Sequence, residues 1–110
     1  MIKIVIRRDF KSDIVEFNVK GHAGFSQHGQ DIVCAAVSVL AQTALIGIHE
    51  YAKVESEYQI SDGNLKCKIP FDISNDKRNI INPILETMVL GLKNIKEEYS
   101  SYIKIKEEEV

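Results

Sequence analysis

The sequence predicts an α+β domain in which two helices pack on a mainly antiparallel sheet, in the order strand-strand-helix-strand-strand-helix-strand. Short segments with alternating apolar residues predict the strands, and two longer apolar segments predict the helices. The chain has 110 residues, 45% of them hydrophobic, with a net charge of −2. That size and composition are typical of one globular domain, so we expect a single domain over residues 1–110.

The first half of the chain predicts a hairpin, a glycine-rich loop and a buried helix. Apolar and polar residues alternate over residues 2–8 and 14–20, which predicts two strands joined by a polar connection. Residues 21–31 hold three glycines and have no apolar period, so we expect a mobile loop. From Ile32 to about Tyr51 apolar residues lie on nearly every face, which predicts a helix buried on several sides, with Asp31 as its N-cap.

The next two strands are predicted to form a hairpin over residues 54–69. Apolar residues alternate on both sides of Asp62 and Gly63, the favoured residue pair of a type I′ turn. With these two residues at the centre of the turn, Tyr58 lies opposite Cys67 on the apolar face. Cys67 is therefore expected to be a thiol of the core.

The second helix ends near Tyr99, but the sequence leaves its start open. Asn82 could cap a helix that has Pro83 in its first turn, or Pro83 could lie inside a helix that begins near Asn75. We expect a final strand over residues 102–106, and we expect the acidic residues after it to form a solvated tail.

Composition excludes several classes of function. The slight negative charge and the lack of a long basic stripe argue against a dedicated nucleic-acid binder. No apolar run reaches the ~18 residues of a membrane span, and the alternating N-terminal residues are unlike a signal peptide. We therefore expect a cytoplasmic protein. Two cysteines and three histidines are too few and too scattered for a structural zinc site, so no metal is expected.

His22 and Cys34 are the residues most suggestive of catalysis. The glycine-rich loop between them can bring the two side chains together, and a thiol with an imidazole is what a cysteine protease requires. The start of a helix favours a thiolate, and its unpaired amides can donate to an oxyanion. Cysteine is also among the most buried residues, so Cys34 could be plain core. Asp31 could act as the helix cap, which we favour, or could help to orient His22.

Two stretches of the sequence match a known pattern. The first is Gly21-His22-Ala23-Gly24 followed by Gly29-Gln30-Asp31-Ile32-Val33-Cys34-Ala35-Ala36-Val37-Ser38, and the second is Glu86-Thr87-Met88-Val89-Leu90-Gly91-Leu92 with Tyr99. In both stretches the chain resembles the ribosomal-processing cysteine protease family, Prp. Pro83 is the one departure that we find, and it lies far from His22 and Cys34 in the sequence.

The resemblance implies a cysteine endopeptidase that removes the short, apolar N-terminal extension of a large-subunit ribosomal protein precursor, through a thioester and without a cofactor. It matches His22 to the catalytic base and Cys34 to the nucleophile. Asp31 and Ser38 match motif positions of less certain role; Ser38 could instead bond its own backbone. The resemblance also implies a homodimer that works in ribosome biogenesis.

The loop supplies further candidates for substrate contact, namely Gly24, Phe25, Gln27, His28 and Gly29. We expect Phe25 to contact an apolar substrate, although it could tuck under the loop, and we favour His28 as an exposed loop residue. The alternative function is a non-catalytic, ribosome-associated module that binds a basic ribosomal protein. Such a module should tolerate Cys34→Ser, whereas a protease should not. A thiol redox role ranks third, because no Cys-x-x-Cys pair is present.

Overall fold

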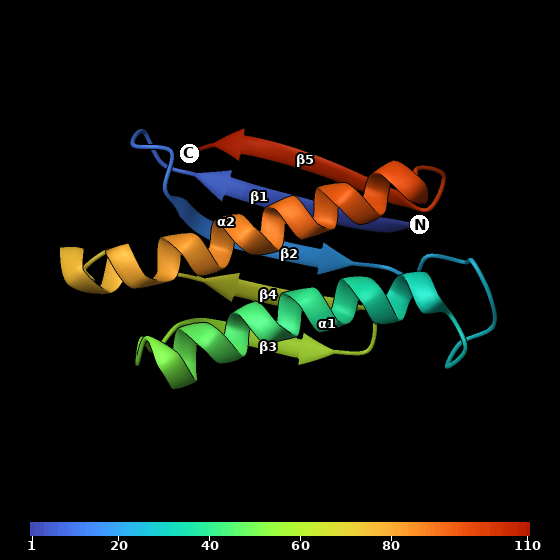
Figure 1. Ribbon diagram of the computed structural model, residues 1–110, viewed down its shortest axis with the longest axis horizontal. Coiled ribbons are helices and arrows are strands. Elements are labelled where there is room, and N and C mark those ends of the chain that lie inside the picture. Colours follow the sequence, from blue (N-terminus) through green and yellow to red (C-terminus); the bar gives the residue numbers. More distant parts are fainter.

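Five strands form one mixed sheet, and both helices lie side by side over the same face of it (Figure 1). The computed structural model describes residues 1–110. The elements in chain order are β1 (Ile2–Arg8), β2 (Ile14–Lys20), α1 (Ile32–Ile46), the π-helical segment η1 (Gly47–Tyr51), β3 (Glu57–Ser61), β4 (Asn64–Lys68), α2 (Asn75–Glu98) and β5 (Ile103–Glu109). The predicted fold class and element order are confirmed.

The strand order across the sheet is β3-β4-β2-β1-β5. β1 and β5 are parallel, and every other neighbouring pair is antiparallel. The β3–β4 hairpin has the predicted register, with Tyr58 opposite Cys67 and the Asp62-Gly63 pair between the strands. β3 begins at Glu57, three residues later than expected, and it is exposed along its whole length at the edge of the sheet.

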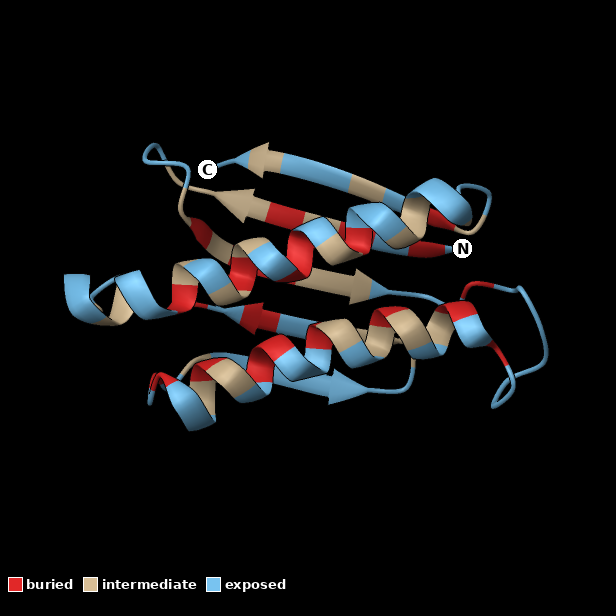
Figure 2. Cartoon of the chain, viewed as in Figure 1, coloured by how far each residue is buried: buried red, intermediate tan, exposed pale blue.

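The core lies between the helices and the inner face of the sheet (Figure 2). Because side chains alternate between the two faces of a strand, the period-two isoleucines of β1 all point inward and are at most 2% exposed. They meet apolar residues of β2, α1 and α2, and burying each such side chain contributes roughly 1.5–3 kcal/mol. The central residues of this layer are Ile2, Ile4, Ile6, Phe17, Val33, Val37, Ala41, Leu85 and Leu92.

The first helix follows the predicted span, because η1 continues α1 as far as Tyr51. Over residues 32–51 it is long and apolar enough to cross a membrane by length and composition alone. Polar residues such as Ser38, Gln42 and Thr43 interrupt it, so the finding does not contradict the expectation that no uninterrupted apolar run reaches that length. It is weak evidence for a span, because the core helix of a globular domain passes the same test. Here the helix packs beside α2 over the sheet.

The second helix begins at Asn75, which decides between the two starts left open by the sequence. Ser74 is its N-cap and accepts a hydrogen bond from the Lys77 backbone N–H at 3.2 Å. Pro83 therefore lies inside the helix, which continues to Glu98.

The acidic C-terminal residues belong to a strand and not to a tail, so that part of the prediction was wrong, although Glu107 and Glu109 are exposed to solvent as expected. Residues 107–109 extend β5 and pair with residues 6–8 of β1. Glu107 lies 3.1 Å from Arg8 and 3.0 Å from Lys93, and Glu108 lies 3.1 Å from Arg7. Lys106 also lies 3.1 Å from Glu108. These ion pairs lower the pKa of both glutamates, chiefly through Lys93 at Glu107 and through Lys106 at Glu108.

Candidate active site

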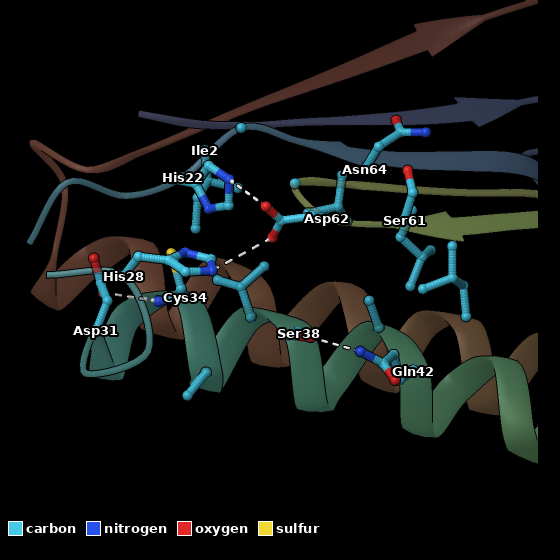
Figure 3. Close-up of a pocket in the computed structure, with 18 of the residues that line it drawn as sticks. Ile2, His22, His28, Asp31, Cys34, Ser38, Gln42, Ser61, Asp62 and Asn64 are labelled. Atoms are coloured by element: carbon cyan, nitrogen blue, oxygen red, sulfur yellow. Dashed lines mark hydrogen bonds and ion pairs between the residues drawn. The ribbon is translucent and has the colours of Figure 1, made fainter.

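A cavity of about 630 Å³ opens between the end of β2, the start of α1 and the β3–β4 turn (Figure 3). Histidine, cysteine and aspartate side chains lie at the end where the glycine-rich loop leaves β2, and other polar side chains, among them Gln42 and Ser61, lie farther along α1 and β3 (Figure 3). Its apolar side chains lie along α1 and the neighbouring strands. The polar group includes His22, His28, Cys34, Ser38 and Asp62, and the apolar group includes Ile2, Val19, Val37, Ile60 and Leu65.

Cys34 lies half-buried in the first turn of α1. The helix start is fixed by Asp31, whose Oδ1 accepts hydrogen bonds from the backbone N–H groups of Val33 and Cys34, both at 3.0 Å. The Cys34 sulfur accepts a further hydrogen bond from the Ala23 N–H at 3.1 Å. Because Ala23 follows His22 directly in the chain, this bond ties the thiol to the segment that carries the imidazole.

Asp31 is the predicted N-cap and also organises the loop. Its Oδ2 accepts hydrogen bonds from the N–H groups of Phe25 at 2.9 Å and Ser26 at 3.2 Å. Burial by itself raises the pKa of Asp31, but the four backbone donors outweigh it and bring the pKa below its usual value. Asp31 is thus held as a carboxylate. It makes no hydrogen bond with His22.

His22 stands at the end of β2, against the turn between β3 and β4. The Gly21 N–H donates to the Gly63 carbonyl at 2.9 Å, which brings this turn to the base of the ring. A Cβ at Gly63 would lie 2.8 Å from His22 Nε2. On the same turn, Asp62 Oδ2 lies 3.9 Å from His22 Nε2. The ring lines the same cavity as Cys34 but is not hydrogen-bonded to it in this conformation.

His28 belongs to the loop but lies beside His22 at the cavity. The two rings meet edge to face with their centroids 5.2 Å apart, and His28 Nε2 lies 3.8 Å from Asp62 Oδ1. Figure 3 shows both histidines turned toward Asp62, with Cys34 at the start of α1. His28 is exposed, as expected, yet it lines the cavity together with Gly29.

Sequence reasoning missed Asp62 as a residue of the site. The Asp62-Gly63 turn was predicted, but only as a connection. Its position depends on the pairing of β4 with β2, which places Asn64 opposite Lys20 and so carries the turn to the end of β2. The Asp62-Gly63 pair in the sequence therefore predicted the turn, but it did not predict that the turn would lie next to His22.

Three other predicted loop residues do not line the cavity. The Phe25 ring packs edge to face on Tyr99 and Tyr102, with centroid distances of 5.5 and 5.3 Å. The Gln27 carbonyl accepts the N–H of Gln30 at 2.9 Å and closes a turn. Gly24 is also absent from the wall of the cavity.

Ser38 lies one helical turn beyond Cys34 and lines the cavity. Its hydroxyl accepts a hydrogen bond from Gln42 Nε2 at 2.7 Å, so its partner is a side chain of the same helix.

The second cysteine is the predicted core thiol. Cys67 is fully buried, and burial raises its pKa to about 11. His49 lies at the far end of the first helix, where its Nε2 is 2.7 Å from the Ser56 hydroxyl. Neither residue lines the cavity.

A thiol at a capped helix start, an imidazole on the facing wall and an apolar groove beside them are the features of a cysteine protease site. A family model described as "Cysteine protease Prp" matches residues 1–104. The chain belongs to this family, and it is a cysteine protease.

Known relatives agree with this assignment. The ribosomal processing cysteine protease Prp of Bacillus subtilis is 29% identical over 107 residues, which cover 96% of each chain. The crystal structure of the Staphylococcus aureus protease Prp with a covalently linked product peptide matches with a TM-score of 0.87 and 27% identity, over 97% of this chain and 99% of that one. A Streptococcus mutans protein matches with a TM-score of 0.84 and 27% identity, over 100% and 96%.

Proposed function

We propose that this protein is a Cys–His endopeptidase that removes the short N-terminal extension of a large-subunit ribosomal protein precursor. The observation that carries the proposal is the placement of Cys34 and His22 in one cavity, with the segment of His22 bonded to the Cys34 sulfur through Ala23. The names of the relatives, which are ribosomal processing proteases, support the substrate class.

In the proposed reaction, His22 takes the proton of Cys34, and the sulfur attacks the scissile carbonyl carbon. The tetrahedral intermediate collapses to a thioester, while His22 gives its proton to the leaving amine. Water then attacks the thioester with His22 again as base, and the acid product leaves. His22 must turn from Asp62 toward Cys34 for this chemistry; catalytic hydrogen bonds are often unformed before substrate binds.

Two of the first-turn amides expected to donate to the oxyanion are already engaged. The first-turn amides of Val33 and Cys34 already donate to Asp31, and the Ala35 N–H donates to the Asp31 carbonyl at 3.0 Å. The Ala23 N–H is the backbone donor bonded to the sulfur itself. It is therefore the group best placed to donate to the developing oxyanion after attack.

The cavity suits an apolar substrate segment. Valine, leucine and isoleucine side chains line it together with polar side chains such as Ser38 and Gln42, and the ionisable groups lie at the thiol end. An extended peptide could bury apolar side chains there and present its scissile bond to Cys34. We further propose that residues 1–110 act as one protease domain, in a cytoplasmic homodimer, without a cofactor, and without direct binding of nucleic acid or membrane.

The test is cleavage of the precursor ribosomal protein, followed by mass spectrometry. Cys34→Ala and His22→Ala should each abolish cleavage while circular dichroism shows an unchanged fold, and the double variant should be no worse than either single one. Cys67→Ala is the matched control and should retain cleavage in its folded fraction. Cleavage by Cys34→Ala near the wild-type rate would reject the protease mechanism and favour the binding module.

A further inference from the structure

The imidazoles of His22 and His28 and the carboxylate of Asp62 converge at the mouth of the cavity. They come from three separate parts of the chain: the end of β2, the glycine-rich loop and the β3–β4 turn. One ligating atom from each lies within 4.8 Å of the other two. Exposed ion pairs contribute little to stability, so the fold itself does not require this convergence.

We propose that His22, His28 and Asp62 bind a divalent transition-metal ion such as Zn²⁺, and that the bound ion inhibits the protease. The second half of this proposal rests on the proposed catalytic role of His22.

The distances are close to those of a zinc site. Zn–N and Zn–O bonds of ~2.0–2.2 Å in tetrahedral geometry place the ligand atoms about 3.3–3.5 Å apart. In the structure the two imidazole nitrogens lie 3.9 and 3.8 Å from the oxygens of Asp62. The two contacts use different oxygens of Asp62, and one atom from each of the three residues lies within 4.8 Å of the other two. The ligand atoms would therefore draw together by up to about 1.5 Å to complete the ligand set.

The three ligand side chains can make this movement with little loss of stability. All three side chains are exposed, at 49% for His22, 74% for His28 and 75% for Asp62, so no packing has to be broken. His28 also lies in the glycine-rich loop, which has open space around Gly24 and Gly29.

The donor types also fit the metal. Two imidazole nitrogens and one carboxylate oxygen are a ligand set that suits zinc and leaves a fourth position for water. The neutral form of each histidine has one unprotonated ring nitrogen to offer.

Binding would block the chemistry in two ways. The metal would occupy His22 Nε2, the nitrogen that faces Asp62, and hold the ring away from Cys34. It would also join the loop at His28 to the β3–β4 turn at Asp62, across the cavity that the substrate has to enter.

Isothermal titration of the full-length protein with ZnCl₂, after treatment with EDTA and dialysis, tests the site without any use of activity. We expect one ion per chain. His28→Asn and Asp62→Asn should each weaken binding at least about tenfold, because each removes a ligand. Cys34→Ala and Asp72→Asn, the latter a matched loss of an exposed carboxylate, should bind zinc as the wild type does.

Cleavage assays then test the inhibition, with each variant compared with its own rate in EDTA. Zinc should inhibit the wild type, and the concentration needed should rise at least about tenfold in His28→Asn. Wild-type affinity in both His28→Asn and Asp62→Asn, or loss of binding in Cys34→Ala, would overturn the site. Zinc binding that leaves wild-type cleavage unchanged would overturn the inhibition alone, and absence of cleavage without zinc would instead count against the proposed function.

Discussion

Gly63→Ala should separate the position of His22 from the stability of the fold. Gly63 has a φ of +68°, and a Cβ there would lie 2.8 Å from His22 Nε2. Alanine at positive φ lowers the free energy of unfolding by about 1–2 kcal/mol. A domain of this kind has ~5–15 kcal/mol of stability, so the variant should remain folded. The half-exposed ring can move aside, so the contact adds little to that loss. The ring must retreat by about 0.6 Å to reach 3.4 Å, where ordinary van der Waals contact begins.

The larger effect of Gly63→Ala should fall on catalysis. His22 turns toward Cys34 from a backbone segment that the Gly63 turn holds in place, and the added methyl group presses on that segment and on the ring. A misplacement of about 1 Å can reduce a rate up to ~100-fold, so we expect kcat/KM for precursor cleavage to drop by about 10- to 100-fold. Urea denaturation measures the stability loss, and single-turnover cleavage measures the rate. Gly24→Ala is the control for backbone strain, because Gly24 has a φ of +73° and open space around it. A wild-type cleavage rate in fully folded Gly63→Ala would refute the idea that this turn positions His22.

Three further predictions concern the thiols, the helix cap and the loop. Brief iodoacetamide treatment should label Cys34 before Cys67, because Cys67 is buried and has a raised pKa of about 11; peptide mapping that finds Cys67 labelled first would contradict this. The lowered pKa of Asp31 means that its carboxylate stabilises the fold above its ordinary pKa and that this contribution is lost as the pH falls through the folded-state value. The stability gap between wild type and Asp31→Asn in urea should therefore be wider at pH 7 than at pH 3, and an equal gap would reject the cap as its source. Phe25→Ala removes ring contacts worth ~0.5–1.5 kcal/mol each, so hydrogen exchange of the loop amides should become several-fold faster; unchanged exchange would show that Asp31 alone holds the loop.

The sequence predicted those parts of the fold that depend on neighbouring residues. The isoleucines of β1 alternate because one face of the sheet is buried, so the bounds of β1 could be inferred. The Asp62-Gly63 pair defines its own turn, so the register of the β3–β4 hairpin could be inferred as well. The Asp31 cap was equally local, since a side chain that caps a helix bonds to amides two and three residues ahead.

What the sequence could not predict depends on residues far apart in the chain. Glu107 lies along β1 because Arg8 and Lys93 form ion pairs with it there. A run of glutamates does not indicate which distant residues will pair with it. Asp62 lies beside His22 because β4 pairs with β2. The alternation of apolar residues predicts each strand but does not predict which strands are neighbours in the sheet. Phe25 looked free on a polar loop because its aromatic partners follow α2.

The parallel pairing of β1 with β5 sets a condition on how the molecule reaches its native state. Arg7 and Glu108 are 101 positions apart, so this contact closes a loop that includes nearly all of the domain, whereas the β3–β4 hairpin closes within a few residues. Loop closure becomes more costly with length, and contacts between distant residues slow folding. During synthesis, β1 therefore presents an unpaired edge until β5 emerges, and an open edge can pair with other chains. Until that moment the nascent chain is at its most vulnerable to aggregation, although every residue that lines the cavity has already been made.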